Sequence, residues 1–213
     1  MSVVESAQGS RRMTGESRRE QILAAALAVF ADGGYAGTTT DQVARAAGVS
    51  QPYVIRLFGS KQQLFLELYQ RVSEHVIEVM EVVSAGPDAG AELGTAYVAL
   101  LADRNRLRLL MHGFVAGSDP AIGALARHAL GAVFRIVRDR TGAPEWAARD
   151  FVAHGVLINV LLAAGALEHA GEDDALDALA SCSVHGRVPS TLTAPTAGGA
   201  SAPVAGCDGA SSR

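Results

Sequence analysis

Aromatic residues and cysteines are scarce in this sequence. Aromatics account for 5% of its 213 residues, and two cysteines, Cys182 and Cys207, are present. Strands favour aromatic and β-branched side chains, whereas the alanine and leucine that abound here favour helices, so a β-rich fold is disfavoured. Two cysteines in or near a low-complexity segment predict neither a disulfide framework nor a zinc site, and a reducing cytoplasm is the expected location.

Long hydrophobic runs are also absent. The longest uncharged apolar stretch covers residues 156–167, twelve residues that include Asn159. A membrane-spanning helix needs about 20 such residues, so the stretch predicts a buried helix and no membrane association. The first ten residues contain no apolar run, and no secretory signal is expected.

The motifs of common enzyme classes are missing. The sequence contains no GxSxG, HExxH or CxxC motif and no glycine-rich loop of the phosphate-binding kind. None of the six histidines lies four residues from another, the spacing that would place a metal-binding pair on one helix face. We therefore expect no enzyme activity, no metal site and no cofactor.

Charge is divided unevenly along the chain. The net charge is −4, yet residues 11–61 carry seven basic side chains against four acidic ones, whereas residues 72–182 carry eight against fifteen. A basic N-terminal part on an acidic body suits a protein that contacts phosphates at one end only.

Helix signals recur along most of the chain, and no strand pattern occurs. The serine or threonine and glutamate or glutamine spacing of a capping box appears three times, at Ser17–Glu20, Thr39–Gln42 and Ser60–Gln63. Apolar residues follow at helical spacing, and the pair Gly33-Gly34 is expected to end the first helix. We predict an all-α fold with helices from 17 to about 33, 40–47, 50 to about 58, 60 to about 83, 89–102, 105–116, 120–141, 145–164 and about 173–180.

The predicted organisation has four parts. Residues 1–16 form a flexible basic arm, 17–63 a three-helix domain, 64–182 a larger helical domain, and 183–213 a tail. In the tail, 22 of 31 residues are Gly, Ala, Ser, Thr or Pro. Such a segment cannot bury enough apolar area to offset its ordering entropy, so we expect it to be disordered.

Residues 39–61 have the spacing of a helix-turn-helix. Two short helices cross closely only where the first presents a small residue, here Ala44, and the turn contains a residue that adopts positive φ, here Gly48. Val49 is expected to fill the turn, and Val54 and Leu57 to form the inner face of the second helix.

The outer face of that second helix is expected to contact DNA. Its polar residues lie mostly in the N-terminal turns, the part that a recognition helix inserts into the major groove. Glutamine can pair with adenine and arginine with guanine or phosphate, and a bound phosphate would explain a lysine at the start of the next helix, where the dipole disfavours cations. The predicted DNA contacts are Thr39, Thr40, Ser50, Gln51, Pro52, Tyr53, Arg56 and Lys61; the alternative is a helical hairpin with ordinary solvated side chains.

Residues 17–65 resemble the DNA-binding domain of the TetR family of transcriptional regulators. The resemblance rests on Phe30, Gly33, Tyr35, Thr38-Thr39, Val43-Ala44, Ala47-Gly48-Val49-Ser50, Phe58, Ser60-Lys61 and Leu64-Phe65. It implies a helical homodimer that binds double-stranded operator DNA, represses a nearby operon and leaves the DNA when a small-molecule effector binds the C-terminal domain. Many relatives carry a phosphate-contacting tyrosine three positions before the motif phenylalanine; here that position is Ile55, and Tyr53 is expected to take over part of its role.

The C-terminal half contains candidate residues for the effector and for dimerisation. The predicted ligand-cavity residues are Met111, His112, Phe114, Phe134 and His154. Simple core filling is the alternative for each of them. The broad apolar surface over 146–164, together with the last helix, predicts the dimer interface, in which Val156 and Val160 share one helix face.

Two alternative functions remain open: a regulator that binds DNA without a ligand, and an activator. A ligand-independent architectural DNA binder would have a small C-terminal domain or none. Residues 64–182 are predicted to be mostly helical, which favours the ligand-released repressor.

Overall fold

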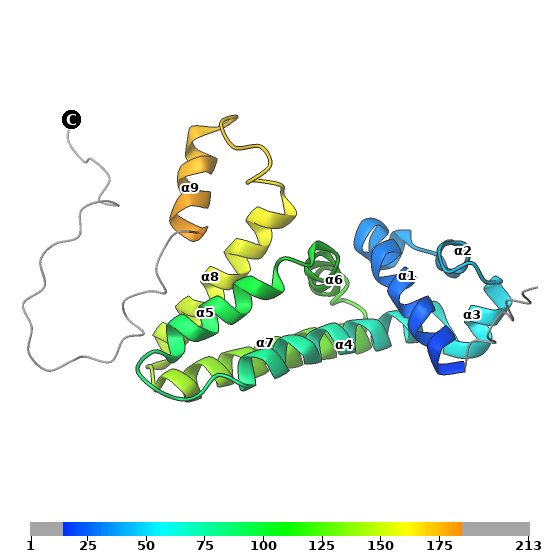
Figure 1. Ribbon diagram of the computed structural model, residues 1–213, viewed down its shortest axis with the longest axis horizontal. Coiled ribbons are helices and arrows are strands. Elements are labelled where there is room, and N and C mark those ends of the chain that lie inside the picture. Colours follow the sequence, from blue (N-terminus) through cyan, green and yellow to red (C-terminus); the bar gives the residue numbers. More distant parts are fainter. Residues whose placement is uncertain (1–14, 185–213) are drawn as a thin grey trace, which may run out of the picture.

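The computed structural model describes residues 15–184, which form nine α-helices (Figure 1). In chain order they are α1 (Gly15–Gly37), α2 (Thr40–Ala46), α3 (Gln51–Phe58), α4 (Lys61–Glu81), α5 (Ala89–Leu100), α6 (Arg104–Val115), α7 (Pro120–Thr141), α8 (Glu145–Ala163) and α9 (Asp174–Val184). The all-α prediction is confirmed, and α2 to α8 begin and end within two residues of their predicted limits. The expectations for a flexible arm and a disordered tail lie mostly outside the described residues.

Side-chain caps set most of the helix starts. Thr39 and Gln42 form the predicted reciprocal capping box at α2, and the Ser60 hydroxyl accepts a hydrogen bond from the backbone N–H of Gln63 at α4. Asp119 accepts two backbone N–H bonds at the start of α7 and a third bond from the Gln62 amide at 2.7 Å. The bond from the Ile122 N–H is the main reason that the pKa of Asp119 lies below its ordinary value.

The predicted capping box at the start of α1 is wrong. Helix α1 begins at Gly15, so Ser17 lies inside its first turn, and Glu20 pairs with Arg71 of α4 instead of closing a capping box. Ser50 does occupy the N-cap position of α3, as its place before this helix suggests, although its side chain makes no capping hydrogen bond. The break at the end of α1 occurs at Gly34 as predicted (φ 66°, ψ 177°), and one further helical turn continues to Gly37.

The helices form a small head and a larger body. Helices α1, α2 and α3 lie at one end of the molecule, and the long helices α4 and α7 run side by side away from it (Figure 1). Helices α5, α6 and α8 pack around this pair, and α9 packs on α8. Helix α4 contacts α1 and α3 at one end and α5, α6 and α7 along the rest of its length, so it belongs to both parts.

One hydrophobic cluster joins the head to the body. It contains Phe30, Val54 and Phe65 from the head helices together with Leu109 of α6 and Ile122 of α7, all of them buried. Gly113 allows α6 to approach α4, because a Cβ at that position would lie 2.0 Å from the Tyr69 ring. The packing is therefore continuous across the predicted domain boundary at residues 63 and 64.

Helices α7 and α8 have the length and hydropathy of membrane-spanning segments. This is a weak indication, because core helices of soluble proteins meet the same criterion. Both pack against neighbouring helices, α7 against α4 and α8 against α7 and α9.

Candidate nucleic-acid interface

Helices α2 and α3 form the helix-turn-helix that the sequence predicts. Ala44 is buried where the two helices meet, and Val54 faces inward from α3. The turn is closed by hydrogen bonds from the N–H of Gly48 to Arg45 and from the N–H of Val49 to Ala44. The backbone of Gly48 has φ 65°, a conformation that residues with a Cβ adopt only with strain.

The opposite face of α3 is solvent-exposed. Gln51, Pro52, Ile55 and Arg56 are exposed, and Tyr53 is half-buried. The Arg56 guanidinium lies 4.8 Å from the centre of the Tyr53 ring. Thr39 and Ser50 are exposed beside this face. The predicted contacts from α3 therefore occur together on one accessible surface.

Gln51 is held in place by a buried threonine. Its side-chain N–H donates to the Thr40 hydroxyl at 3.1 Å, and Thr40 is 7% exposed. The second amide N–H and the amide oxygen of Gln51 can still form the bidentate pair that glutamine makes with adenine. Thr40 thus supports Gln51 rather than presenting its own side chain at the surface.

Lys61 has a structural partner within the head. Its ammonium donates to the carbonyl oxygen of Tyr35 at 2.9 Å and lies 4.7 Å from the centre of the Tyr35 ring. A cation at the C-terminal end of α1 is favoured by the helix dipole. This contact accounts for Lys61 without a bound phosphate, and its contact with DNA stays a prediction.

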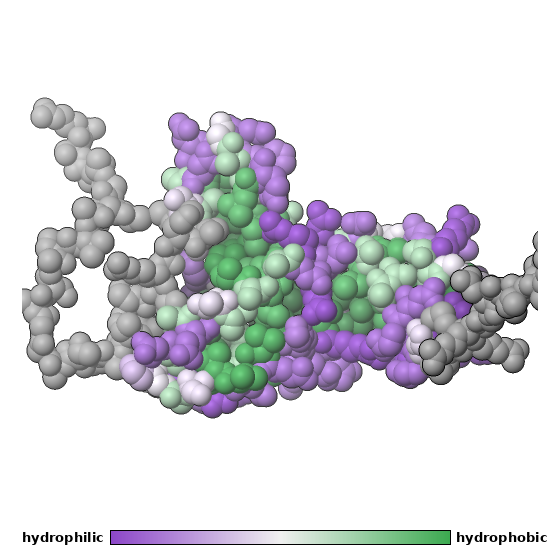
Figure 2. Space-filling view, in the orientation of Figure 1, coloured by the Kyte–Doolittle hydropathy of each residue, from purple (hydrophilic) through white to green (hydrophobic). Residues whose placement is uncertain are grey.

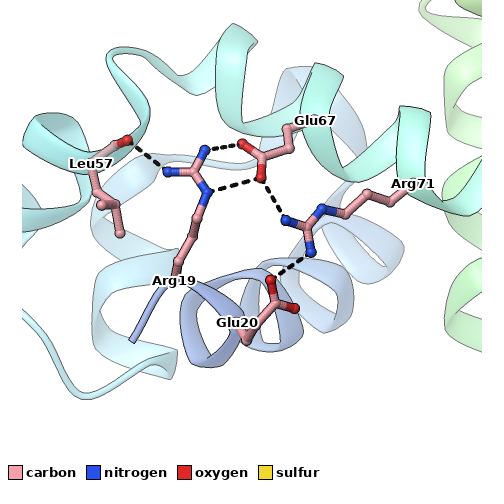
Figure 3. A network of polar contacts seen from close by, with 5 residues as sticks. All are labelled: Arg19, Glu20, Leu57, Glu67 and Arg71. Atoms are coloured by element: carbon pink, nitrogen blue, oxygen red, sulfur yellow. Dashed lines mark hydrogen bonds and ion pairs between the residues drawn. The ribbon is translucent and has the colours of Figure 1, made fainter. Parts of the chain in front are cut away.

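Arg19 connects three helices of the head (Figure 3). Its guanidinium pairs with both carboxylate oxygens of Glu67 in α4 and donates to the carbonyl oxygen of Leu57 in α3 at 3.1 Å. It also lies 4.5 Å from the centre of the Phe58 ring. These contacts hold the C-terminal end of the recognition helix against α1 and α4. Local sequence patterns do not indicate them, because the partners are 38 and 48 residues away.

Arg71 extends this network along α4 (Figure 3). Its guanidinium pairs with Glu67 at 3.0 Å and with Glu20 of α1 at 2.6 Å. The hydrogen bond to Glu20 is the main reason that the pKa of Arg71 is raised. The network therefore ties α1 to α4 at two successive turns.

The head matches a known family of regulators. The sequence profile described as bacterial regulatory proteins, tetR family, matches residues 22–68, which run from α1 into α4. The transcriptional activator FasR of Mycolicibacterium smegmatis is 39% identical over 66 residues, 31% of this chain and 30% of its own length. The transcriptional regulator RutR of Escherichia coli K12 is 33% identical over 64 residues, 30% of each chain. The head of this chain is therefore a TetR-family DNA-binding domain. The chain spans about 30% of the length of these two curated relatives.

The similarity of fold extends beyond the head. The solved structure of a TetR-family member from Streptomyces coelicolor A3 superimposes with a TM-score of 0.60 at 22% identity, covering 79% of this chain and 96% of that one. A transcriptional regulator from Rhodococcus sp. Rha1 gives a TM-score of 0.62 at 19% identity, with coverages of 80% and 97%. The body of this chain therefore shares its fold with theirs.

The body contains a cavity between α4, α5, α6, α7 and α8. The space between its walls is ≈ 620 Å³, part of which is open to solvent. Aromatic and aliphatic side chains such as Met80, Phe114 and Phe151 form most of the lining, and the polar residues are Ser73, Tyr97 and Asn159. Cavities that are lined mostly by apolar side chains with a few polar groups commonly bind small molecules.

Of the five predicted cavity residues, only Phe114 lines this cavity. His112 lies between body and head, where its Nε2 is 3.0 Å from the carbonyl oxygen of Ala31. Met111 packs on the cluster of Leu101, Leu107 and Ile158, Phe134 packs on the cluster that contains Met80, and His154 is half-buried outside the lining. The lining residues that the sequence did not predict come from five helices, α4 to α8, which lie far apart along the chain.

Proposed function

We propose that this protein is a transcriptional regulator that acts as a homodimer. Each subunit binds operator DNA through α3, and a small-molecule effector releases the protein from the DNA. The observation that carries the proposal is the exposed surface of α3, where Gln51, Tyr53 and Arg56 lie together above a closely packed helix-turn-helix. Glutamine in the first turn of a recognition helix, as Gln51 is here, and arginine such as Arg56 in its last turn can supply hydrogen bonds to base edges.

The dimer interface is proposed on α8 and α9. Large apolar side chains are exposed along this part of the body: Trp146 (50%), Val160 (45%), Leu167 (43%) and Leu179 (44%). Hydrophobic residues also gather over α5 and α8 on the face drawn in Figure 2. Two heads in one dimer would read half-sites about 34–36 Å apart, one turn of duplex.

Helix α4 supports a coupling between effector and DNA. Ser73, Val76 and Met80 line the body cavity, and Glu67 and Arg71 of the same helix bind the head helices. A ligand that shifts α4 would therefore move the contacts that hold α3. Typical couplings are ~1–3 kcal/mol, which corresponds to an operator affinity about 5- to 150-fold lower. Release from a repressing position is the reading we adopt; FasR, named an activator, makes activation the second candidate.

A matched pair of glutamine variants tests the DNA interface. An operator would be selected from random duplex DNA and titrated by fluorescence anisotropy at several salt concentrations. We expect Gln51→Ala to weaken operator binding by ~1–3 kcal/mol and to leave random DNA binding unchanged. Gln70→Ala is the control, because Gln70 is exposed on α4 and bonds only to Glu74 within the described residues. Equal affinities for the two variants would refute the assignment of α3.

A test of the dimer interface requires a pair of substitutions other than Val156 with Val160, the two residues that the sequence places on one helix face. Val156 lines the cavity, so a charge there would disturb ligand binding as well as assembly. Val160→Asp with Leu179→Asp changes only exposed side chains and is expected to yield monomers with lost operator binding. Val115→Asp, at an 83% exposed position on α6, is the control. Sedimentation of the double variant as a dimer would exclude this interface.

A further inference from the structure

The residues that line the body cavity indicate what kind of molecule it binds. We propose that its occupant is an uncharged, largely apolar molecule with one hydrogen-bonding group, directed at the Ser73 hydroxyl. This inference rests on the proposed function, because it names the class of effector. Three features of the lining carry it.

The first feature is the absence of formal charge. Of the 14 described residues that line the cavity, none is Asp, Glu, Lys, Arg or His. A charged ligand would lose its hydration on entry and find no ion partner, which opposes binding strongly. An uncharged ligand avoids this penalty. Carboxylates and amines are therefore disfavoured.

The second feature is a polar group of the lining that has no hydrogen-bond partner within the described residues. Ser73 is 6% exposed, and its Oγ makes no hydrogen bond with any described residue. The Tyr69 hydroxyl, one turn earlier on α4, is likewise buried without a partner in hydrogen-bond geometry among the described residues, although it lies close enough to Ser73 for that hydroxyl to oppose the rise in the pKa of Tyr69. Burial raises the pKa of Tyr69 to about 12, so the phenol stays neutral. A buried hydroxyl without a partner is costly, and a ligand group that bonds to Ser73 would remove that cost.

The third feature is that the other two polar side chains of the lining, Tyr97 and Asn159, bond to each other. The Tyr97 hydroxyl donates to the Asn159 side-chain oxygen at 2.8 Å. Burial raises the pKa of Tyr97, so this residue too remains neutral at physiological pH. Gly155 faces the Tyr97 ring, and a Cβ there would lie 3.3 Å from it. The Tyr97 hydroxyl is thus already bonded to Asn159, which leaves Ser73 as the lining hydroxyl without a partner within the described residues.

Two probes of equal chain length test the charge preference. The full-length protein would be titrated by calorimetry with 1-decanol and with decanoate at about pH 8, where the acid is ionised. We expect decanol to bind at least about tenfold more tightly than decanoate. Leu130 lines the cavity and is 37% exposed, so an arginine there has access to solvent. Leu130→Arg is expected to shift the preference toward decanoate.

Ser73→Ala tests the hydrogen bond. It is expected to weaken decanol binding about 2- to 10-fold. The melting temperature of the ligand-free variant is expected to be unchanged or higher, because the change removes an unpaired buried hydroxyl. Ser118→Ala, in the exposed segment before α7, is the control and should alter neither quantity.

Three results would overturn the inference: no binding of decanol, equal binding of decanoate, or a Ser73→Ala variant with unchanged decanol affinity. These titrations contain no DNA. A failed effector class is therefore distinguishable from a failed proposed function, which would appear as the absence of a selectable operator.

Discussion

Replacing Arg19 with alanine is expected to loosen the recognition helix without touching the surface that faces DNA. Arg19 lies on α1, and its guanidinium joins Glu67 of α4 to the Leu57 carbonyl of α3 (Figure 3). The carbonyls in the last turn of a helix lack partners within that helix. Removing the guanidinium leaves the Leu57 carbonyl and the Glu67 carboxylate each with one partner fewer.

The size of the effect follows from these contacts. A hydrogen bond to a charged group contributes ~1.5–3 kcal/mol, and a partly exposed guanidinium over an aromatic ring about 0.5–1 kcal/mol. The Arg19–Glu67 ion pair is roughly a quarter exposed (28% and 25%), so solvent screening limits its contribution to about 1 kcal/mol or less. We expect Arg19→Ala to lower the free energy of unfolding by about 2–4 kcal/mol. Arg19→Lys should restore only part of the lost free energy of unfolding, because an ammonium cannot bind both carboxylate oxygens in the planar, bidentate way that a guanidinium does.

Denaturant unfolding and operator anisotropy would be measured together for each variant. Operator affinity should fall for Arg19→Ala even where the protein is fully folded, because α3 is no longer held at its C-terminal end. Arg45→Ala is the matched control: Arg45 is 80% exposed and pairs only with Asp41 one turn away within the described residues. Arg45→Ala is expected to lower the free energy of unfolding by less than about 0.5 kcal/mol. The reasoning is refuted if the two arginine variants unfold at the same denaturant concentration.

Three further changes test packing, a lysine contact and a helix cap at other places in the protein. Gly113→Ala should destabilise the protein by about 1–3 kcal/mol in thermal unfolding, because its Cβ would overlap the Tyr69 ring. Gly131→Ala is the control and should be stabilising, because a Cβ there meets only the end of the Arg135 side chain, at 3.2 Å. Lys61→Ala should lower the melting temperature through loss of its bond to the end of α1; if Lys61 also contacts phosphate, operator and random DNA binding should both weaken and the salt slope fall by about one unit. The pKa of Asp119 is lowered by its capping bonds, so its contribution to stability is present above its ordinary pKa of 3.8 and is lost as the pH falls through the folded value. The difference in unfolding midpoint between the wild type and Asp119→Ala should therefore be constant near neutral pH and shrink in acid, and a difference that persists at the lowest pH would contradict this.

Helix limits and the helix-turn-helix could be predicted from the sequence because their causes are local. Thr39 and Gln42 are three residues apart, and their reciprocal bonds need only the first turn of α2. Gly48 is required by the backbone of its own turn, where φ is positive. The prediction failed at Ser17, where α1 begins two residues earlier.

The cavity and the links between helices were decided by tertiary structure alone. Periodicity shows which face of a helix is apolar, but not which apolar residues face a space left between five helices, so Phe114 was predicted and Ser73 was not. The partners of Arg19, Lys61 and His112 are 26 to 81 residues away. Contacts of this kind depend on how whole helices pack, since a side chain's local sequence neighbours do not determine what the fold places beside it.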